Sequence, residues 1–193
     1  MKLTKTLSLL SALLISTVSY AEYQLDSAAS SINFTSIKKT SIAEVHSFKK
    51  ISGTISPTGL AQLSVNLDSV ETNIAIRNQR MQTMLFETSL YPDASVSAQL
   101  DSKQLAPVTA GQSLQLPVEF TFELHGATKS ITSTVSVLGL AGGGLQVNSI
   151  QPIILNAADF ALLDGIQKLM IVANLPAIAS AVPLTFNLVF KPI

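Results

Sequence analysis

The stretch QLPVEFTFELHG, from Gln115 to Gly126, alternates apolar and polar residues almost without a break. Its apolar positions are Leu116, Val118, Phe120, Phe122 and Leu124. Successive side chains of a β-strand point to opposite faces of the sheet. The stretch is therefore predicted to be a strand with one apolar face, and Gly126 is predicted to belong to the hairpin loop that follows it.

The same two-residue period recurs along most of the chain. It is present in the segments 32–34, 51–55, 63–67, 96–100, 131–137 and 184–190. Turn signals separate these segments, among them Pro57 to Gly59 and the glycines from Gly142 to Gly144. About eight or nine short strands of this kind indicate an all-β sandwich or barrel. We favour a barrel, because closure leaves no unpaired edge in a chain with few charges to protect one.

A first segment breaks this rhythm with helical spacing. Ile74, Arg77, Met81 and Leu85 recur at intervals of three and four residues. Spacing of this kind is typical of one face of a helix. We predict a short helix over about residues 78–86, with Asn73 as a candidate cap.

A second break lies in AADFALLDGIQKLMIVANL, residues 157–175. Here Phe160, Leu163, Ile166 and Met170 fall at helical spacing, and Asp159 lies near the start. We predict a helix or helix-like excursion of about 10 residues. Gly165 weakens it by roughly 1 kcal/mol relative to alanine.

The N-terminal residues have the pattern of a secretory signal peptide. Lys2 and Lys5 precede the apolar run LSLLSALLISTV, which is shorter than the about 20 residues that a membrane-spanning helix needs. Ser19 and Ala21 then supply the small residues of a cleavage site. We expect cleavage of residues 1–21, a single domain over residues 22–193 and a periplasmic location; an uncleaved membrane anchor is the alternative.

The composition argues against several classes of protein. Cysteine is absent, so neither disulfides nor thiol chemistry is possible. Charged residues make up 12 % of the chain, with 12 basic and 12 acidic residues, so there is no sign of the basic face that nucleic-acid binding needs. Beyond the N-terminus, the apolar run that comes nearest to a membrane span is interrupted by Asn174 and Pro176.

Motifs for catalysis or metal binding are not found. His46 and His125 lie far apart and in no metal-ligating pattern, so we expect a structural or surface role for both. Neither a nucleophile elbow nor a phosphate-binding loop is present. Arg77 and Arg80 are neighbours on the first predicted helix, and guanidinium groups suit phosphate or carboxylate partners. A surface pair or a structural salt bridge is the alternative.

Four motifs, taken in order, resemble the landmarks of the YceI-like family of polyisoprenoid-binding periplasmic proteins. They are YQLDSAASSINF (23–34), FKKISGTI (48–55), VETNIAIRNQRMQTMLFETSLYPDASVSA (70–98) and FTFELHGATKSITSTVSV (120–137). The resemblance implies an all-β fold, an extended antiparallel eight-stranded lipocalin-like barrel with one or two short helices. It also implies an apolar tunnel that holds an isoprenoid or other lipid chain, and it implies no covalent chemistry.

The chain departs from the family pattern on the short helix. Family members commonly carry Arg-Asp-x-His there, whereas this chain has Arg77, Asn78, Gln79 and Arg80. Met84 and Leu85 stand where the family has a proline-containing turn. The segment 158–182 looks longer and more apolar than the family's usual approach to its last strand, and its part at one end of the tunnel is left open.

Inward positions of such a barrel alternate with outward ones. The predicted tunnel lining is Phe34, Leu67, Met81, Met84, Leu85, Phe86, Val96, Val118, Phe120, Phe122, Leu124, Phe186 and Phe190. Among these, the segment 81–86 is expected either to cover the tunnel mouth or to pack the helix on the barrel. Arg77 and Arg80 are the candidates for contact with a head group. Small inward residues at Gly53, Ala94, Ala98 and Ser133 favour a hollow interior over a filled one.

These expectations favour a non-catalytic periplasmic carrier that holds a polyisoprenoid, quinone-like or other long-chain lipid. No cofactor is expected besides such a lipid, and no nucleic acid. The chain is not expected to span a membrane; transient membrane contact and a homodimer are both compatible with the sequence. The alternatives are a structural or adhesion module with a filled barrel and, less favoured by the residues, an enzyme acting on a hydrophobic substrate.

Overall fold

A computed structural model describes residues 22–101, 103 and 108–193, so the predicted signal peptide lies outside the described residues. Within them the chain forms twelve strands. These are β1 (Tyr23–Leu25), β2 (Ser31–Lys38), β3 (Ile42–Phe48), β4 (Ile51–Ile55), β5 (Leu60–Asn66), β6 (Val70–Glu71), β7 (Asp93–Gln99), β8 (Ser113–Leu124), β9 (Ala127–Gly139), β10 (Leu145–Ser149), β11 (Ile153–Asn156) and β12 (Ala181–Pro192).

The strands close into an antiparallel barrel. Among the described residues, eight strands form the ring β1-β4-β5-β7-β8-β9-β10-β12, and β12 returns to β1 through the pairing of Phe190–Pro192 with Tyr23–Leu25. The remaining strands extend the ring at one end, where β2 pairs with β12 and β3, β3 pairs with β6, and β11 pairs with β12. The predicted eight-stranded, lipocalin-like barrel is confirmed.

The alternating stretch of the sequence forms β8, whose residues all pair with β9. Leu116, Val118 and Phe122 are buried, whereas Glu119 and Glu123 on the opposite face are exposed. The partner strand contributes Val135 opposite Leu116, and Val135 is also buried. Burial of one face fixes the register, because a slip of one residue would turn every apolar side chain to water.

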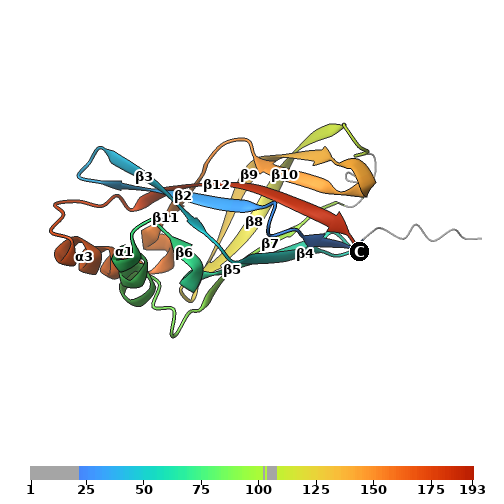
Figure 1. The fold of residues 1–193 in the computed structure, drawn as a ribbon. Coiled ribbons are helices and arrows are strands. Elements are labelled where there is room, and N and C mark those ends of the chain that lie inside the picture. The colour runs from blue at the N-terminus through green and yellow to red at the C-terminus, as the bar shows by residue number, and fades with distance from the viewer. Residues whose placement is uncertain (1–21, 102, 104–107) are drawn as a thin grey trace, which may run out of the picture.

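Two short helices lie at the end of the barrel away from the C-terminus (Figure 1). They are α1 (Ala75–Arg80), which continues into a π-helical turn η2 (Met81–Leu85), and α3 (Leu163–Val172). Single turns of 3₁₀-helix complete the structure at η1 (Leu67–Ser69), η3 (Ala141–Gly143) and η4 (Ala157–Phe160). No helix among the described residues is long and apolar enough to cross a bilayer.

The helix limits differ from those predicted. The first helix begins at Ala75 rather than near Asn78, and Ile74 rather than Asn73 occupies the cap position. Asn78 lies within the helix, and its side-chain oxygen accepts hydrogen bonds from the backbone N–H (2.9 Å) and the hydroxyl (2.5 Å) of Thr72. This contact ties the helix to the strand segment that precedes it.

The second helical region is split in two. Asp159 lies in η4, and left-handed Ala161 (φ 54°) separates this turn from α3. The split changes the helical phase, and Leu163, which falls at helical spacing with Phe160 and Ile166 in the sequence, is exposed. Phe160 and Ile166 are buried.

The two helical segments pack directly against each other through Gly165. A Cβ atom at this position would lie 2.7 Å from the carbonyl oxygen of Met84 and 2.8 Å from Cα of Leu85. The glycine therefore allows α3 to rest on the backbone of η2. Together α1, η2 and α3 form a helical cap over one end of the barrel.

Substitution of Gly165 tests this contact. We expect Gly165→Val to lower the free energy of unfolding by about 2–3 kcal/mol, because the added atoms overpack the interface with η2. The matched control is Gln167→Val on the exposed face of the same helix, where we expect a change below about 1 kcal/mol. Urea unfolding of both variants measures the difference, and equal stability would contradict the packing argument.

Candidate binding cavity

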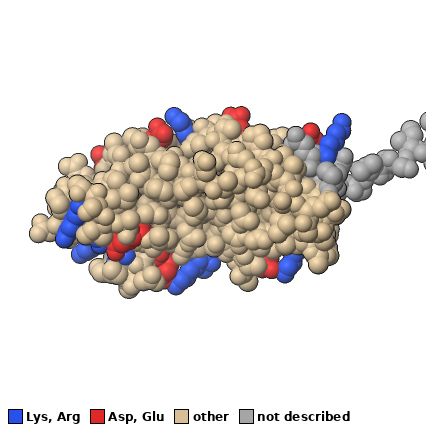
Figure 2. Space-filling model, turned by 90° about the horizontal axis from the view of Figure 1, so that it is seen from above, with Lys and Arg blue, Asp and Glu red and all other residues tan. Residues whose placement is uncertain are grey.

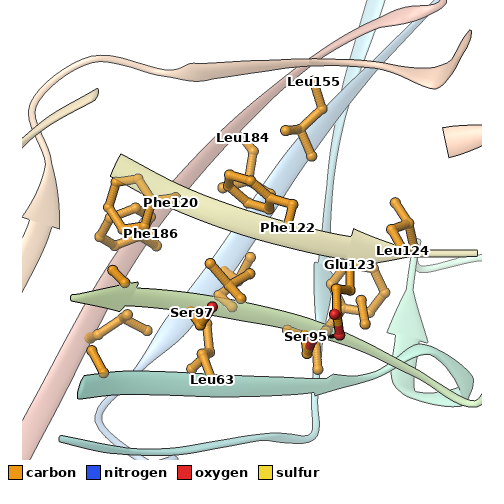
Figure 3. A pocket seen from close by; sticks show the side chains of 18 of the residues that line it. Leu63, Ser95, Ser97, Phe120, Phe122, Glu123, Leu124, Leu155, Leu184 and Phe186 are labelled. Carbon is orange, nitrogen blue, oxygen red and sulfur yellow. Dashed lines mark hydrogen bonds between the residues drawn. The ribbon is translucent and has the colours of Figure 1, made fainter. Parts of the chain in front are cut away.

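An apolar cavity of about 220 Å³ runs inside the barrel (Figure 3). Its wall extends from Leu100 and Leu145, in the closed ring, to Leu162 and Ile166 beneath the helical cap. Among the described residues that line the cavity, Gln62, Ser95, Ser97 and Glu123 are polar and all the others are apolar. These four occupy the strand positions that alternate with inward-facing Leu63, Val96 and Phe122, so apolar side chains form the inner surface. The hydroxyl of Ser95 donates to the carboxylate of Glu123 at 2.7 Å, so these two polar groups satisfy each other.

The structure places most of the predicted lining residues on this wall. They are Phe34, Leu67, Leu85, Phe86, Val96, Val118, Phe120, Phe122, Leu124, Phe186 and Phe190. Among the small residues that predicted a hollow interior, Ala94 and Ala98 lie on the wall, but Gly53 and Ser133 do not. A Cβ atom at Gly53 would lie 2.7 Å from the carbonyl oxygen of Gln62, so this glycine permits close strand pairing and adds no space.

Met81 and Met84 lie outside the cavity wall, unlike their predicted place. Met81 is buried in a cluster with Leu67, Val70 and Phe86, where it attaches the helix to the barrel. Met84 is half-buried, and its carbonyl group faces Gly165. In the π-helical turn the N–H of Phe86 donates to the carbonyl oxygen of Met81 at 2.9 Å, and Leu85 and Phe86 at its end line the cavity.

Aromatic rings narrow the cavity along its length. The ring centroids of Phe120 and Phe186 are 6.1 Å apart with an edge-to-face arrangement, and those of Phe120 and Phe122 are also 6.1 Å apart. Nearer the helical cap, Phe34 and Phe48 lie 5.3 Å apart. These rings supply much of the apolar surface of the wall.

Sequence reasoning missed the part of the wall that η4, Leu162 and α3 supply. Ala157, Phe160, Leu162 and Ile166 all line the cavity, and all are buried. The helical spacing of Phe160 and Ile166 was a usable signal that this segment packs on something apolar. The periodicity of a helix does not say whether its apolar face meets a filled core or the end of a cavity.

The arginines of the short helix lie close to the cap. The guanidinium of Arg77 donates from Nη1 to Glu44 at 2.9 Å and from Nη2 to the carbonyl oxygen of Thr72 at 2.6 Å. Lys38 also binds Glu44, at 2.6 Å, and its hydrogen bond, with the one from Arg77, holds the pKa of Glu44 below its ordinary value. Arg80 is half-buried and forms no salt bridge among the described residues.

A buried polar residue of β3, His46, adjoins the cavity. His46 is 3 % exposed, and its Nε2 lies 2.8 Å from the hydroxyl of Ser36. Its ring centroid is 5.2 Å from that of Phe34, which lies on the cavity wall. Within the described residues, neither Nδ1 of His46 nor Nε of Arg77 has a hydrogen-bond partner. Two unused polar atoms thus lie near the cap end of an apolar cavity.

His125 contacts Glu87 and Tyr91. Its Nε2 lies 3.1 Å from the carboxylate of Glu87, and its ring centroid is 4.4 Å from that of Tyr91. Lys168 on α3 lies 3.5 Å from the same carboxylate. Glu87 therefore joins the end of β8 to the helical cap, and among the described residues no group of histidine and acidic side chains has the arrangement of a metal site.

A closed barrel around an apolar cavity is the architecture of a small-molecule binding domain. Comparison with known proteins identifies the family. The family model described as the YceI-like domain matches residues 23–190, so the chain belongs to the YceI-like family. No curated protein matches the chain.

Solved structures share the fold. A polyisoprenoid-binding domain from Saccharophagus degradans, implicated in plant cell wall breakdown, is 38 % identical, with a TM-score of 0.87 over 89 % of this chain and 98 % of that one. BcnA of Burkholderia cenocepacia is 15 % identical, with a TM-score of 0.64 over 86 % of this chain and 98 % of that one. A YceI protein of Campylobacter jejuni is 17 % identical, with a TM-score of 0.53 over 77 % of this chain and 84 % of that one. The last two comparisons concern the fold alone.

The burial of His46 predicts a pH dependence of stability. Desolvation, with the nearby charge of Arg77, holds the pKa of His46 below the ordinary 6.5. The unfolded chain therefore takes up a proton before the folded protein does, and stability falls as the pH drops through about 6.5. We expect a smaller fall for His46→Gln, which retains a hydrogen-bonding partner for Ser36.

Urea unfolding between about pH 7.5 and 5.5 measures this dependence. The carboxyl groups of Glu44 and Glu71, whose pKa values lie below 4.5 and at about 2, titrate at lower pH and do not interfere. An identical pH dependence in the wild-type protein and His46→Gln would exclude His46 as its source.

Proposed function

We propose that the protein is a non-catalytic periplasmic carrier that holds a polyisoprenoid, quinone-like or other long-chain lipid in the barrel cavity. The observation that carries the proposal is the almost wholly apolar wall, which runs from the closed ring to the helical cap. The relative from Saccharophagus degradans, described as polyisoprenoid-binding, supports the same class of ligand. The N-terminal signal-peptide pattern supports export to the periplasm.

The energetics of burial favour such a ligand. Each CH₂ group removed from water contributes roughly 0.8 kcal/mol, so an isoprene unit contributes some 3–4 kcal/mol before losses. Three or four units therefore exceed the roughly 8 kcal/mol of micromolar binding, even after the chain and the protein lose freedom. Binding of this kind depends on length and girth and tolerates several lipids.

The size of the cavity constrains how a long chain is accommodated. An apolar cavity of roughly 150 Å³ can hold benzene, and the cavity here is about 220 Å³. A chain of several isoprene units therefore requires the wall to widen or the chain to emerge from one end. The lining leucines and phenylalanines can change rotamer, whereas the strands that carry them are held by the closed barrel.

The polar head of the lipid is proposed to meet the cap end, where Arg77 and Arg80 lie. Glu44 and Thr72 hold the guanidinium of Arg77. Its Nε has no hydrogen-bond partner among the described residues and could donate to an oxygen atom of the lipid head. The unpartnered Nδ1 of His46 lies in the same region, beside Phe34. A carbonyl, hydroxyl or phosphate oxygen is the chemistry that these groups would recognise.

Filling the cavity tests the proposal. We expect Ala98→Phe to weaken the binding of a fluorescent farnesyl probe by at least about tenfold, which corresponds to about 1.4 kcal/mol. The control is Thr132→Phe, which adds the same ring to an exposed position on β9. Fluorescence titration measures the affinity for the probe, and thermal unfolding confirms that both variants are folded. If Ala98→Phe does not fold, Ala98→Leu is the milder substitution to test.

Equal affinity in the two phenylalanine variants, together with no lipid in organic extracts of protein purified from its native host, would overturn the carrier proposal. That result would favour the structural or adhesion module, whose barrel needs only a stable interior.

A series of chain lengths tests the tunnel itself. We expect the affinity for unbranched alcohols to rise with each added CH₂ by up to about fourfold, the equivalent of roughly 0.8 kcal/mol, and to level off once the cavity is full. Displacement of the farnesyl probe measures the series. An affinity that does not depend on length would indicate binding to the surface instead of the interior.

A further inference from the structure

The end of the molecule that carries the helical cap also carries exposed apolar side chains. Eleven large apolar side chains of the described residues are exposed, and five of them form what we call the apolar rim: Ile42, Ile74, Ile76, Ile171 and Val172. Ile171 is 72 % exposed, at the end of α3. Isolated exposed apolar residues are ordinary, but several at one end of a molecule indicate an interaction site.

Backbone contacts bring the three parts of the apolar rim to the same end. The tip of the β2–β3 hairpin meets the segment after α3, because the N–H of Lys39 donates to the carbonyl oxygen of Ala177 at 2.9 Å. Arg77 of α1 binds Glu44 of β3 at 2.9 Å, two residues from Ile42. Figure 1 shows this hairpin, α1 and α3 together at the end opposite the C-terminus.

Basic side chains accompany the apolar rim. The β2–β3 hairpin, α1 and α3 carry five basic residues, Lys38, Lys39, Arg77, Arg80 and Lys168, and two acidic residues, Glu44 and Asp164. Glu71 and Glu87 lie beside them, on Asn78 and Lys168. These elements therefore carry an excess of positive charge, whereas the whole chain has equal numbers of basic and acidic residues. Figure 2 shows lysine and arginine side chains at the same end, with acidic side chains beside them, and a largely uncharged face between the two ends.

We propose that this end of the protein docks on the surface of a bilayer that contains anionic phospholipid. The apolar rim enters the boundary between head groups and acyl chains, as amphipathic helices do. Lysine and arginine near an anionic surface strengthen such binding roughly fivefold each. Docking in this orientation places the cap end of the cavity against the membrane.

The shape of the apolar rim favours a bilayer over a protein partner. Its side chains lie at the hairpin, at the start of α1 and at the end of α3, which are separate projections rather than one flat or concave face. Separate projections can each enter a fluid surface, whereas a stable protein interface needs a continuous, complementary area. The alternative is that a second copy of this chain binds the apolar rim, and the experiment must distinguish this from binding to a bilayer.

Vesicle flotation of the mature protein without cargo tests the proposal. We expect the protein to float with phosphatidylcholine vesicles that contain phosphatidylglycerol, less with phosphatidylcholine alone, and less at high salt. We expect the double variant Ile171→Ser, Val172→Ser to lower the partition coefficient about tenfold or more, and Lys39→Gln to lower it several-fold. The matched control is Ile193→Ser, an equally exposed residue at the opposite end, which should not change it.

Failure to float, insensitivity to anionic lipid, or an equal loss in Ile193→Ser would overturn the proposal. Light scattering identifies the competing occupant: a dimer that Ile171→Ser, Val172→Ser converts to a monomer would make the apolar rim a self-association surface. Docking goes beyond the proposed function and needs no cargo. Binding of the farnesyl probe in solution without vesicles distinguishes failure of docking from failure of the proposed function. The substituted residues lie outside the cavity wall, so the variants should still bind the probe.

Discussion

Closure of the sheet through β12 is the constraint on which the rest of the structure depends. One edge of this strand pairs with β1 and β2, and the other pairs with β10 and β11. With both edges of β12 paired, the backbone polar groups are satisfied in the wall, and the interior needs only apolar side chains. An apolar cavity can persist there because water has no polar partners inside it.

The helical cap follows from that closure. A barrel removes sheet edges but leaves open ends, and here α1, η2 and α3 cover one of them. The contact at Gly165 and the carboxylate of Glu87, which meets both His125 and Lys168, hold the cap together and to the barrel. The cap side chains Leu85 and Ile166 line the cavity, so the elements that cover the end also shape it. The polar side chains of Arg77 and His46 lie at the same end of the barrel.

The barrel strands could be predicted from residues because each has a local cause. The alternation in β8 and β12 specifies which side chains point inward, and most of the lining residues inferred from it lie on the cavity wall. The helices were less accessible, because their limits depend on particular contacts. Asn78 extends α1 toward Thr72, and left-handed Ala161 changes the phase of α3, so that Leu163 is exposed. The spacing of residues in the sequence indicates neither the Asn78–Thr72 contact nor the left-handed conformation of Ala161.

From the residues alone one could read the strand pattern, the alternation of faces and, through four ordered motifs, the family. These properties are local, since a two-residue period and a turn signal act over a few residues. The place of Met81 and Met84, the partner of Arg77 and the hollow between the phenylalanines came from packing between segments distant along the chain. Volume left unfilled is a property of all the surrounding side chains together, and for that reason no single stretch of sequence could reveal it.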